Sequence, residues 1–263
     1  MLFRHDGPMS GTQPPPSEER FSNRVENYIR YRPSYPEEMV DLLVREAGLS
    51  PESVIADIGS GTGISSELFL KRGYQVTGVE PNAPMRQAAE RLLAEYPQFR
   101  SVDGNARATT LPDGSVDLVI AAQAFHWFES EDTRAEFTRI RKPDGKVALI
   151  WNERRTASTP FLRDYEALLN RFGTDYADIR HENIGTESME RFFPDGYVVH
   201  TFFYQQRFSR EALEGRLLSS SYTPSPGHPD HEPMIAELRR LHDLHAEDGM
   251  VEVDYDTRVY FGH

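Results

Sequence analysis

The sequence predicts an open α/β fold, in which a mostly parallel sheet of seven strands has helices on both faces and an antiparallel strand at its C-terminal edge. Between residues 54 and 153, apolar segments of strand length alternate with segments whose apolar residues recur at helical spacing. Parallel strands need crossover connections of roughly a dozen residues, and most of the intervening segments are that long. Beyond residue 153, two long alternating segments, 197–208 and 250–262, are typical of an antiparallel pair.

The individual elements follow from this alternation. Parallel strands are expected at 54–59, 74–80, 99–106, 116–125 and 146–153. Helices are expected at 64–73, 83–96, 132–142, 159–173 and 233–245. The last two helices are predicted to lie near the edge of the sheet where ligands bind.

The chain is predicted to form a single domain over residues 21–263. Residues 1–20 contain "GTQPPPSEER" and scattered Gly, Pro and Ser, a composition typical of a mobile tail. Residues 21–50 precede the first strand and are expected to form an N-terminal lid. Two helical insertions are expected, near 157–193 and near 208–246.

The composition excludes several classes of protein. The chain has 263 residues, is 38% hydrophobic and contains no cysteine, which rules out disulfides and thiolate chemistry. Its formal net charge of −13 repels nucleic acid phosphates, so no nucleic acid partner is expected. No apolar run approaches the roughly 18 residues of a membrane span, and the N-terminus lacks the apolar core of a signal peptide. We therefore predict a cytoplasmic protein, monomeric or homodimeric, that does not bind a membrane.

The segment "VIADIGSGTG" places three alternating glycines after the first strand, at Gly59, Gly61 and Gly63. In an open α/β sheet this turn is where the backbone approaches a cofactor, and glycine leaves no Cβ in the way. Glu80 ends the second strand, where a carboxylate accepts hydrogen bonds from both ribose hydroxyls. A dinucleotide site requires G-x-G-x-x-G, but Ile64 occupies the position of its third glycine. The spacing therefore disfavours an NAD-dependent oxidoreductase, which stays an alternative.

The observed pattern, D-x-G-x-G-x-G, resembles motif I of the class I S-adenosylmethionine-dependent methyltransferases, which have a Rossmann-like fold. The resemblance extends through "GVEPNAPM", "VDGNARATTLPDGSVDLVIAAQAFHWF" and "GKVALIWNE". Within that class, "YRPSYP" and "AFHWF" are similar to the small-molecule branch of type 11 methyltransferases that includes trans-aconitate methyltransferase-like proteins. The likeness covers about residues 21–153 well and the C-terminal third loosely.

The resemblance implies S-adenosylmethionine as the cofactor and assigns the residues that bind it. They are Asp57, Gly59, Ser60, Gly61, Thr62 and Gly63 beside the methionine part, Glu80 on the ribose, Pro81, Met85, Asn105 and Ala106 around the adenine, and Gln123 and Ala124 beneath the sulfonium. Relatives often carry an acid at or just after position 105. The Asn105 amide is expected to accept from the adenine amino group instead.

Other residues are candidates for the acceptor side of the site. His126 and Trp127 follow the fourth strand, where His126 is either a catalytic residue facing the acceptor or a packed core group. Tyr28, Tyr31 and Arg32 resemble a lid over the cofactor, with surface packing as the alternative. Arg154 and Arg155 follow the fifth strand and could hold a carboxylate, or could begin a solvated helix.

The resemblance thus implies methyl transfer to a small-molecule acceptor, with an oxygen of a carboxylate or hydroxyl favoured. Methyl transfer from a sulfonium needs alignment and exclusion of water, and the nine histidines show no ligand pattern, so no metal is expected. A general base is needed only for an acceptor that loses a proton. A non-catalytic protein that binds S-adenosylmethionine remains a second alternative.

Overall fold

The computed structural model describes residues 25–174, 176 and 185–263. The predicted N-terminal tail lies outside these residues, as do the first part of the predicted lid and residues 175 and 177–184 of the first insertion. The described strands are β1 (Val54–Ile58), β2 (Gln75–Val79), β3 (Phe99–Val102), β4 (Val116–Ala122), β5 (Arg141–Arg154), β6 (Tyr197–Phe208) and β7 (Val251–Gly262).

The described helices are α1 (Val25–Tyr31), α2 (Glu37–Glu46), α3 (Ile64–Leu70), α4 (Ala83–Leu92), α5 (Glu131–Ile140), α6 (Pro160–Phe172), α7 (Thr186–Phe192), α8 (Arg210–Leu218) and α9 (His231–His245). A 3₁₀ turn, η2 (Phe125–Trp127), follows β4. Several helices begin at a side-chain cap: Asn82, Ser130, Thr159 and Ser209 each accept a hydrogen bond from a backbone N–H of the first turn.

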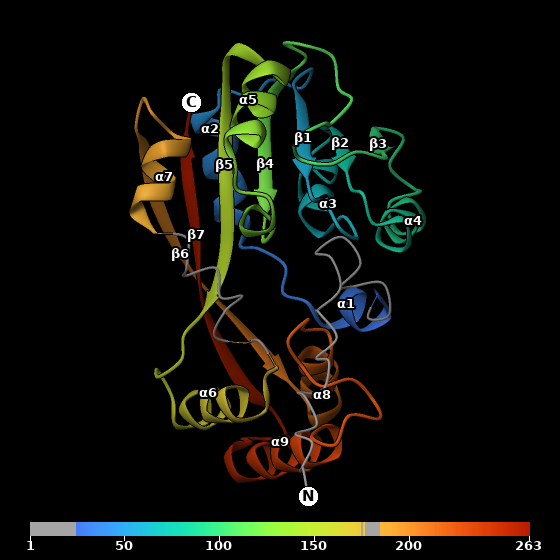
Figure 1. Ribbon diagram of the computed structural model, residues 1–263, viewed down its shortest axis with the longest axis vertical. Helices are drawn as coiled ribbons and strands as arrows, with labels where there is room; N and C mark the ends of the chain where they lie inside the picture. Colours follow the sequence, from blue (N-terminus) through green and yellow to red (C-terminus); the bar gives the residue numbers. More distant parts are fainter. Residues whose placement is uncertain (1–24, 175, 177–184) are drawn as a thin grey trace, which may run out of the picture.

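The seven strands form one sheet in the order β3-β2-β1-β4-β5-β7-β6, which confirms the predicted fold class (Figure 1). Strands β1 to β5 pair in parallel, while β7 is antiparallel to both of its neighbours. β7 is inserted between β5 and β6, so the edge of the sheet is β6 rather than the C-terminal strand itself. The connection from β3 to β4 contains no helix, although the other parallel crossovers do.

Each face of the sheet has its own apolar core, because neighbouring residues of a strand point to opposite faces. On β4, Val119 packs in the core that α5 and α7 cover, and Ile120 packs in the core that α2 and α3 cover. α7 therefore lies against the sheet with α5, where the rings of Phe192 and Phe125 meet edge to face with centroids 4.6 Å apart. The first predicted insertion is thus divided between two places in the fold.

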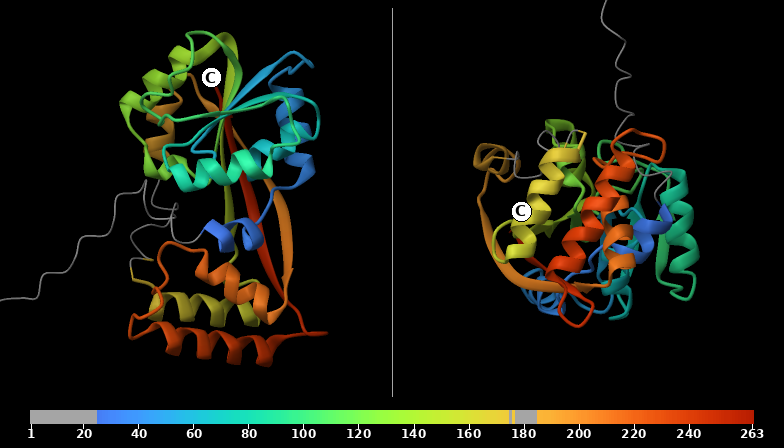
Figure 2. Two further views of the ribbon diagram at one scale, coloured as in Figure 1. Left: turned by 90° about the vertical axis from the view of Figure 1, so that its right-hand side faces the viewer. Right: turned by 90° about the horizontal axis from the view of Figure 1, so that it is seen from below.

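A separate layer of helices lies beyond the carboxyl ends of the parallel strands. α6, α8 and α9 form this layer, and the long strands β5, β6 and β7 run into it from the sheet (Figures 1 and 2). The three helices share a third apolar core with the layer's end of β7. α1 lies between the layer and the sheet, where the ring of Tyr31 packs against Gly215 of α8. None of the described helices is both long and apolar enough to span a bilayer.

Candidate functional site

A cavity of about 470 Å³ lies between the carboxyl edge of the sheet and the helical layer. At its sheet end it is lined by residues that follow β1, β2, β3 and β4. At its other end it is lined by residues of β5, β7 and the helical layer. The parallel strands converge there because their carboxyl ends meet at one edge; Ile58 pairs with Val79, and Asp57 pairs with Ile120.

The glycine loop after β1 adopts the conformation that its sequence predicts. Gly59, Gly61 and Gly63 all have positive φ, at 71°, 57° and 86°. A Cβ on Gly59 would lie 2.8 Å from the Cβ of Ala124, so the protein itself excludes a side chain there. A Cβ on Gly61 would have only the Met85 Cε nearby, at 3.6 Å, and would project where the loop lines the cavity. Close approach of a ligand to the backbone is therefore best supported at Gly61.

Ser60, Thr62 and Gly63 do not line the main cavity. Ser60 and Thr62 are buried and line a small adjoining hollow of about 20 Å³ together with Arg32. Gly63 caps α3, and a Cβ there would lie 2.5 Å from the Cδ1 of Leu93. These three residues therefore belong to the glycine loop but not to the wall of the main cavity.

The Glu80 carboxylate lines the cavity and also holds the loop in place. Its Oε2 accepts from the Gly61 N–H at 2.9 Å, and its Oε1 accepts from the Asn82 N–H at 2.8 Å. The residue is 9% exposed, and burial raises the pKa of its carboxyl against the lowering effect of those two N–H groups. Each oxygen keeps a lone pair for a further donor. Glu80 can therefore bind a ligand while it orders the backbone of Gly61.

Asp57 is fully buried at the end of β1 and does not line the cavity. Its Oδ2 accepts from the hydroxyls of Ser65 and Ser66 at 2.6 and 2.7 Å. Burial raises the pKa of Asp57 to about 6, although the two serine hydrogen bonds lower it. In this structure Asp57 joins the start of α3 to the end of β1.

The residues predicted around an adenine lie together on one wall of the cavity. Pro81, Met85, Asn105 and Ala106 all line it, and Met85 and Ala106 are buried apolar groups. Asn105 differs from its predicted role, because its Oδ1 already accepts from the N–H groups of Arg107 and Ala108, at 2.9 and 3.1 Å. Its amide NH₂, a donor, is the group that remains for a ligand.

Gln123 and Ala124 follow β4 and line the cavity as predicted. Gln123 has a φ of 55°, a left-handed conformation that is unfavourable for a residue with a side chain. Its Nε2 donates to the carbonyl of Asn152 at 3.1 Å, which secures the side chain against β5. Such strain occurs preferentially at functional sites.

His126 and Trp127 also line the cavity, and their rings pack together with centroids 4.7 Å apart. The indole N–H of Trp151 faces the Nδ1 of His126 at 3.5 Å. An indole N–H can only donate, so Nδ1 is the accepting nitrogen of the pair and the neutral ring carries its proton on Nε2. His126 is half-buried and lines the cavity, so its ring is not enclosed in the core.

The predicted lid residues are placed by α1 and the turn that follows it. Arg32 lines the cavity and donates from Nη2 to the carbonyl of Ser219 at 2.9 Å. Tyr31 packs on α8 and does not line the cavity. Tyr28 belongs to α1, but its side chain lies outside the described part of the structure.

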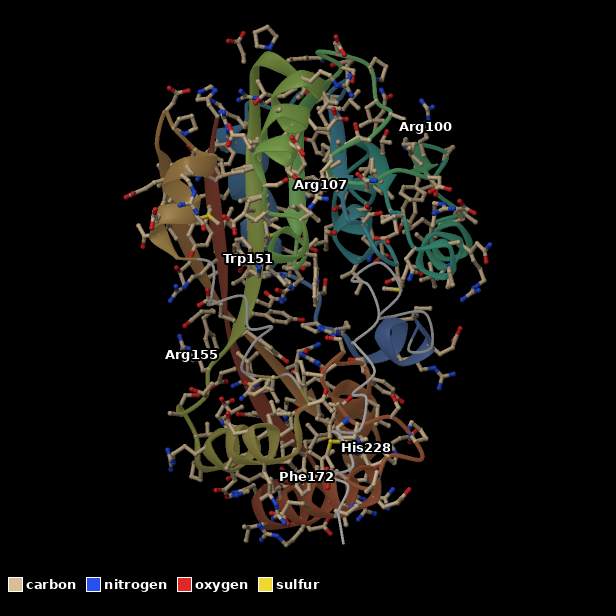
Figure 3. All side chains as sticks on the ribbon, in the orientation of Figure 1. Arg100, Arg107, Trp151, Arg155, Phe172 and His228 are labelled. Atoms are coloured by element: carbon tan, nitrogen blue, oxygen red, sulfur yellow. The ribbon has the colours of Figure 1, made fainter. Side chains whose placement is uncertain are left out.

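The two arginines after β5 have different surroundings. Arg154 lines the cavity, with its side chain 12% exposed, and pairs with Glu166. Arg155 does not line the cavity. It pairs with Asp256 at 2.7 Å, lies over the ring of Phe203, and is found at the side of the molecule in Figure 3.

Several residues that line the cavity could not be identified from a motif in the sequence. They come from the far end of β5, from β7 and from the helical layer: Asn152, Thr156, Tyr176, Arg216, Ser221, Tyr222 and Tyr255. Burial raises the pKa of Tyr176 above its ordinary value, so that its hydroxyl is a neutral donor. These positions are up to 103 residues apart in the chain (152 to 255), and no local motif links them.

The comparisons with known proteins agree with this geometry. Residues 56–149, which include the glycine loop and Glu80, match the model of a methyltransferase domain family. An uncharacterised methyltransferase of Geobacillus kaustophilus is 31% identical over 156 residues, which are 56% of this chain and 68% of that protein. The chain belongs to the class I S-adenosylmethionine-dependent methyltransferases.

Other relatives match this chain over a smaller share of their length. A methyltransferase-like protein of Schizosaccharomyces pombe is 32% identical over 59% of each chain, and an uncharacterised methyltransferase of Mycobacterium bovis is 34% identical over 60% of this chain and 62% of its own. The chain thus spans about three fifths of these curated relatives.

Solved structures share the fold of this chain over most of its length. A proposed type II methyltransferase from Anaeromyxobacter dehalogenans superposes with a TM-score of 0.64 and 24% identity, covering 89% of this chain and 98% of that one. The YcgJ protein from Bacillus subtilis superposes with a TM-score of 0.55 and 18% identity, covering 86% and 97%. At these identities the likeness concerns the fold.

The cavity of this chain fits S-adenosylmethionine, the cofactor of its class. Glu80 presents a carboxylate suited to a ribose, and Gly61 leaves room for a ligand against the backbone. The sheet also differs from a dinucleotide-binding domain, in which the six strands are parallel, because β7 is antiparallel here. The structure therefore agrees with the cofactor that the resemblance implies.

Proposed function

We propose that this chain transfers a methyl group from S-adenosylmethionine to an oxygen of a small-molecule acceptor, either a carboxylate or a hydroxyl. The supporting observation is that one cavity contains the glycine loop and Glu80 at one end and polar groups of the helical layer at the other. Its volume of about 470 Å³ is on the scale of small-molecule sites.

The residues at the sheet end would hold the cofactor. Glu80 would accept from the ribose hydroxyls, Pro81 and Met85 would pack on the adenine, and the Gly59–Gly61 backbone would lie beside the methionine part. When bound, the cofactor supplies an electrophilic methyl group that a nucleophilic oxygen accepts by in-line displacement.

The chain's own residues would position the acceptor and exclude water. Gln123 and Ala124 line the cavity directly after β4, and Arg32 lines it from the turn after α1. His126 offers an Nε2–H donor, because its Nδ1 faces the Trp151 indole N–H. A donor orients a carboxylate oxygen, which needs no deprotonation, whereas a hydroxyl acceptor would need a base. The arrangement therefore favours a carboxylate acceptor.

The test combines binding with methyl transfer. Calorimetry is expected to show binding of S-adenosylhomocysteine and no binding of NAD. S-adenosylmethionine carrying a labelled methyl group is then offered with small carboxylic acids, phenols and amines, and the label is expected in an acid or a phenol. Binding without transfer would support a non-catalytic cofactor-binding protein, and preferential labelling of amines would contradict the assignment to oxygen.

A further inference from the structure

The cavity is cationic although the chain is strongly acidic. The formal net charge of the chain is −13. The described residues that line the cavity include four arginines, Arg32, Arg107, Arg154 and Arg216, and one carboxylate, Glu80. The local field in the cavity therefore favours an anion, against the field of the whole molecule.

Arg154 and Arg216, the two arginines at the helical end, differ in the groups that surround their guanidinium charges. Arg154 pairs with Glu166, and its Nη2 donates to the hydroxyl of Tyr176 at 3.0 Å. Arg216 of α8 donates from Nη1 to the hydroxyl of Ser220 at 3.0 Å and hydrogen bonds to Tyr255. Its Nε is shielded from solvent and has no hydrogen-bond partner. No carboxylate in the described part of the chain forms an ion pair with Arg216.

A shielded guanidinium without a counter-ion is unfavourable, because it loses hydration and gains no opposite charge. Its planar fork matches the two oxygens of a carboxylate. The rings of Tyr222 and Tyr255 line the same end of the cavity and offer hydroxyl donors and flat apolar surfaces. We propose that the acceptor is a small carboxylic acid that binds with a carboxylate on Arg216, an inference that rests on the function proposed above.

The cofactor's own carboxylate has a nearer cation. Arg32 lines both the cavity and the hollow beside Gly59, Ser60 and Thr62, so it lies next to the loop that would hold the methionine part. Arg216 lines only the main cavity, among residues of the helical layer. An acid held by Arg216 would extend from there toward the end of β4, where Gln123 and His126 lie.

The test measures binding to the full chain saturated with S-adenosylhomocysteine. The probes are benzoate, 4-hydroxybenzoate and succinate, each paired with its neutral amide, in calorimetric titrations. At least one acid is expected to bind roughly tenfold or more tightly than its amide, and Arg216→Gln is expected to remove that preference while leaving S-adenosylhomocysteine affinity unchanged. Arg210→Gln, an exposed arginine on the same helix, is the matched control and should behave as wild type.

Two further measurements separate binding from folding. Without ligand, Arg216→Gln is expected to melt at the same temperature as wild type or higher, because a poorly compensated charge is removed. If this variant does not fold, Arg216→Lys replaces it, and weaker binding of acids with unchanged binding of amides would support the proposal, since lysine lacks the planar fork.

Other outcomes would overturn the proposal that a carboxylate of the acceptor binds Arg216. These are equal binding of acids and amides, absence of any binding that depends on Arg216 across the panel, or loss of S-adenosylhomocysteine affinity in Arg216→Gln, which would assign Arg216 to the cofactor. A wild-type chain that binds no S-adenosylhomocysteine would instead refute the proposed function, so the two failures are distinguishable.

Discussion

The two ends of the cavity are built in different ways. At the sheet end, the loops that follow β1 to β4 supply the lining, which includes Gly59 and Gly61, two residues without a side chain. At the helical end, the lining consists of long side chains from distant segments, such as Arg154, Arg216 and Tyr255. The first end is set by backbone conformation, and the second by packing between elements.

This difference suggests how the two ends tolerate change. A backbone-lined surface stays the same when many surrounding side chains change, so one cofactor site can persist while sequences diverge. A surface lined by side chains changes chemistry with each substitution. The acceptor end is therefore where specificity would be decided in this fold, and substitutions at the two ends should have separable effects.

The largest effect on stability is expected at the helical end. Arg154→Ala would remove the Arg154 guanidinium from beside the carboxylate of Glu166, which is 16% exposed, and should reduce the free energy of unfolding by about 3–5 kcal/mol. Arg155→Ala is the matched control, because its pair with Asp256 is more exposed and is worth about 1 kcal/mol or less. Urea denaturation of both variants measures the difference, and equal losses would contradict this description of Arg154.

At the sheet end, Glu80→Ala should lower the affinity for S-adenosylhomocysteine by at least about 100-fold. Two ribose hydroxyls would lose a charged acceptor, each hydrogen bond being worth roughly 1.5–3 kcal/mol. Calorimetry measures the change. Asp103→Asn, an exposed acid paired with Arg86, serves as the control. Unchanged affinity in Glu80→Ala would show that Glu80 does not bind the cofactor.

Where the two ends meet, His126→Ala should lower the turnover of an accepted acid by about 100-fold, with S-adenosylhomocysteine affinity nearly unchanged. The expected cause is loss of a donor that orients the acceptor. His126→Gln, which keeps an N–H donor, should recover part of the rate. A fall in melting temperature with normal turnover would make His126 a packing residue.

The smallest effect is expected at Asp57, which is buried at the end of β1, just before the glycine loop. The pKa of Asp57 is about 6 in the folded protein, above the ordinary 3.8, so its ionisation at neutral pH opposes folding. Its contribution to stability is fully present below pH ~4 and is lost as the pH rises through about 6. Asp57→Asn should therefore become more stable relative to wild type over this window, by up to about 2–3 kcal/mol.

Urea denaturation of the cofactor-free protein at about pH 5 and about pH 8 checks this trend. Asp248→Asn is the control, since Asp248 is exposed and asparagine tolerates its positive φ of 51°. A stability difference that is the same at both pH values would show that burial of the Asp57 charge is not costly.

The strand and helix pattern and most of the cofactor end could be predicted from the sequence. Periodicity placed the segment 197–208 as a strand with the bounds it has, and the glycine spacing with Glu80 placed two neighbouring strand ends at one site. Such features are local: a turn requires positive φ within a few residues, and parallel strands end at a common edge.

The tertiary structure alone decided the rest. Arg154 and Arg155 are adjacent in sequence, yet only Arg154 lines the cavity. Arg154 is the last residue of β5, whereas Arg155 follows the strand and pairs with Asp256 of β7. The side-chain Oδ1 of Asn105 accepts a hydrogen bond from the N–H of Arg107 in the same turn, and the residue type alone did not reveal this. Arg216 and Tyr255 meet through the docking of α8 on β7, and contacts between distant segments depend on packing that no local pattern encodes.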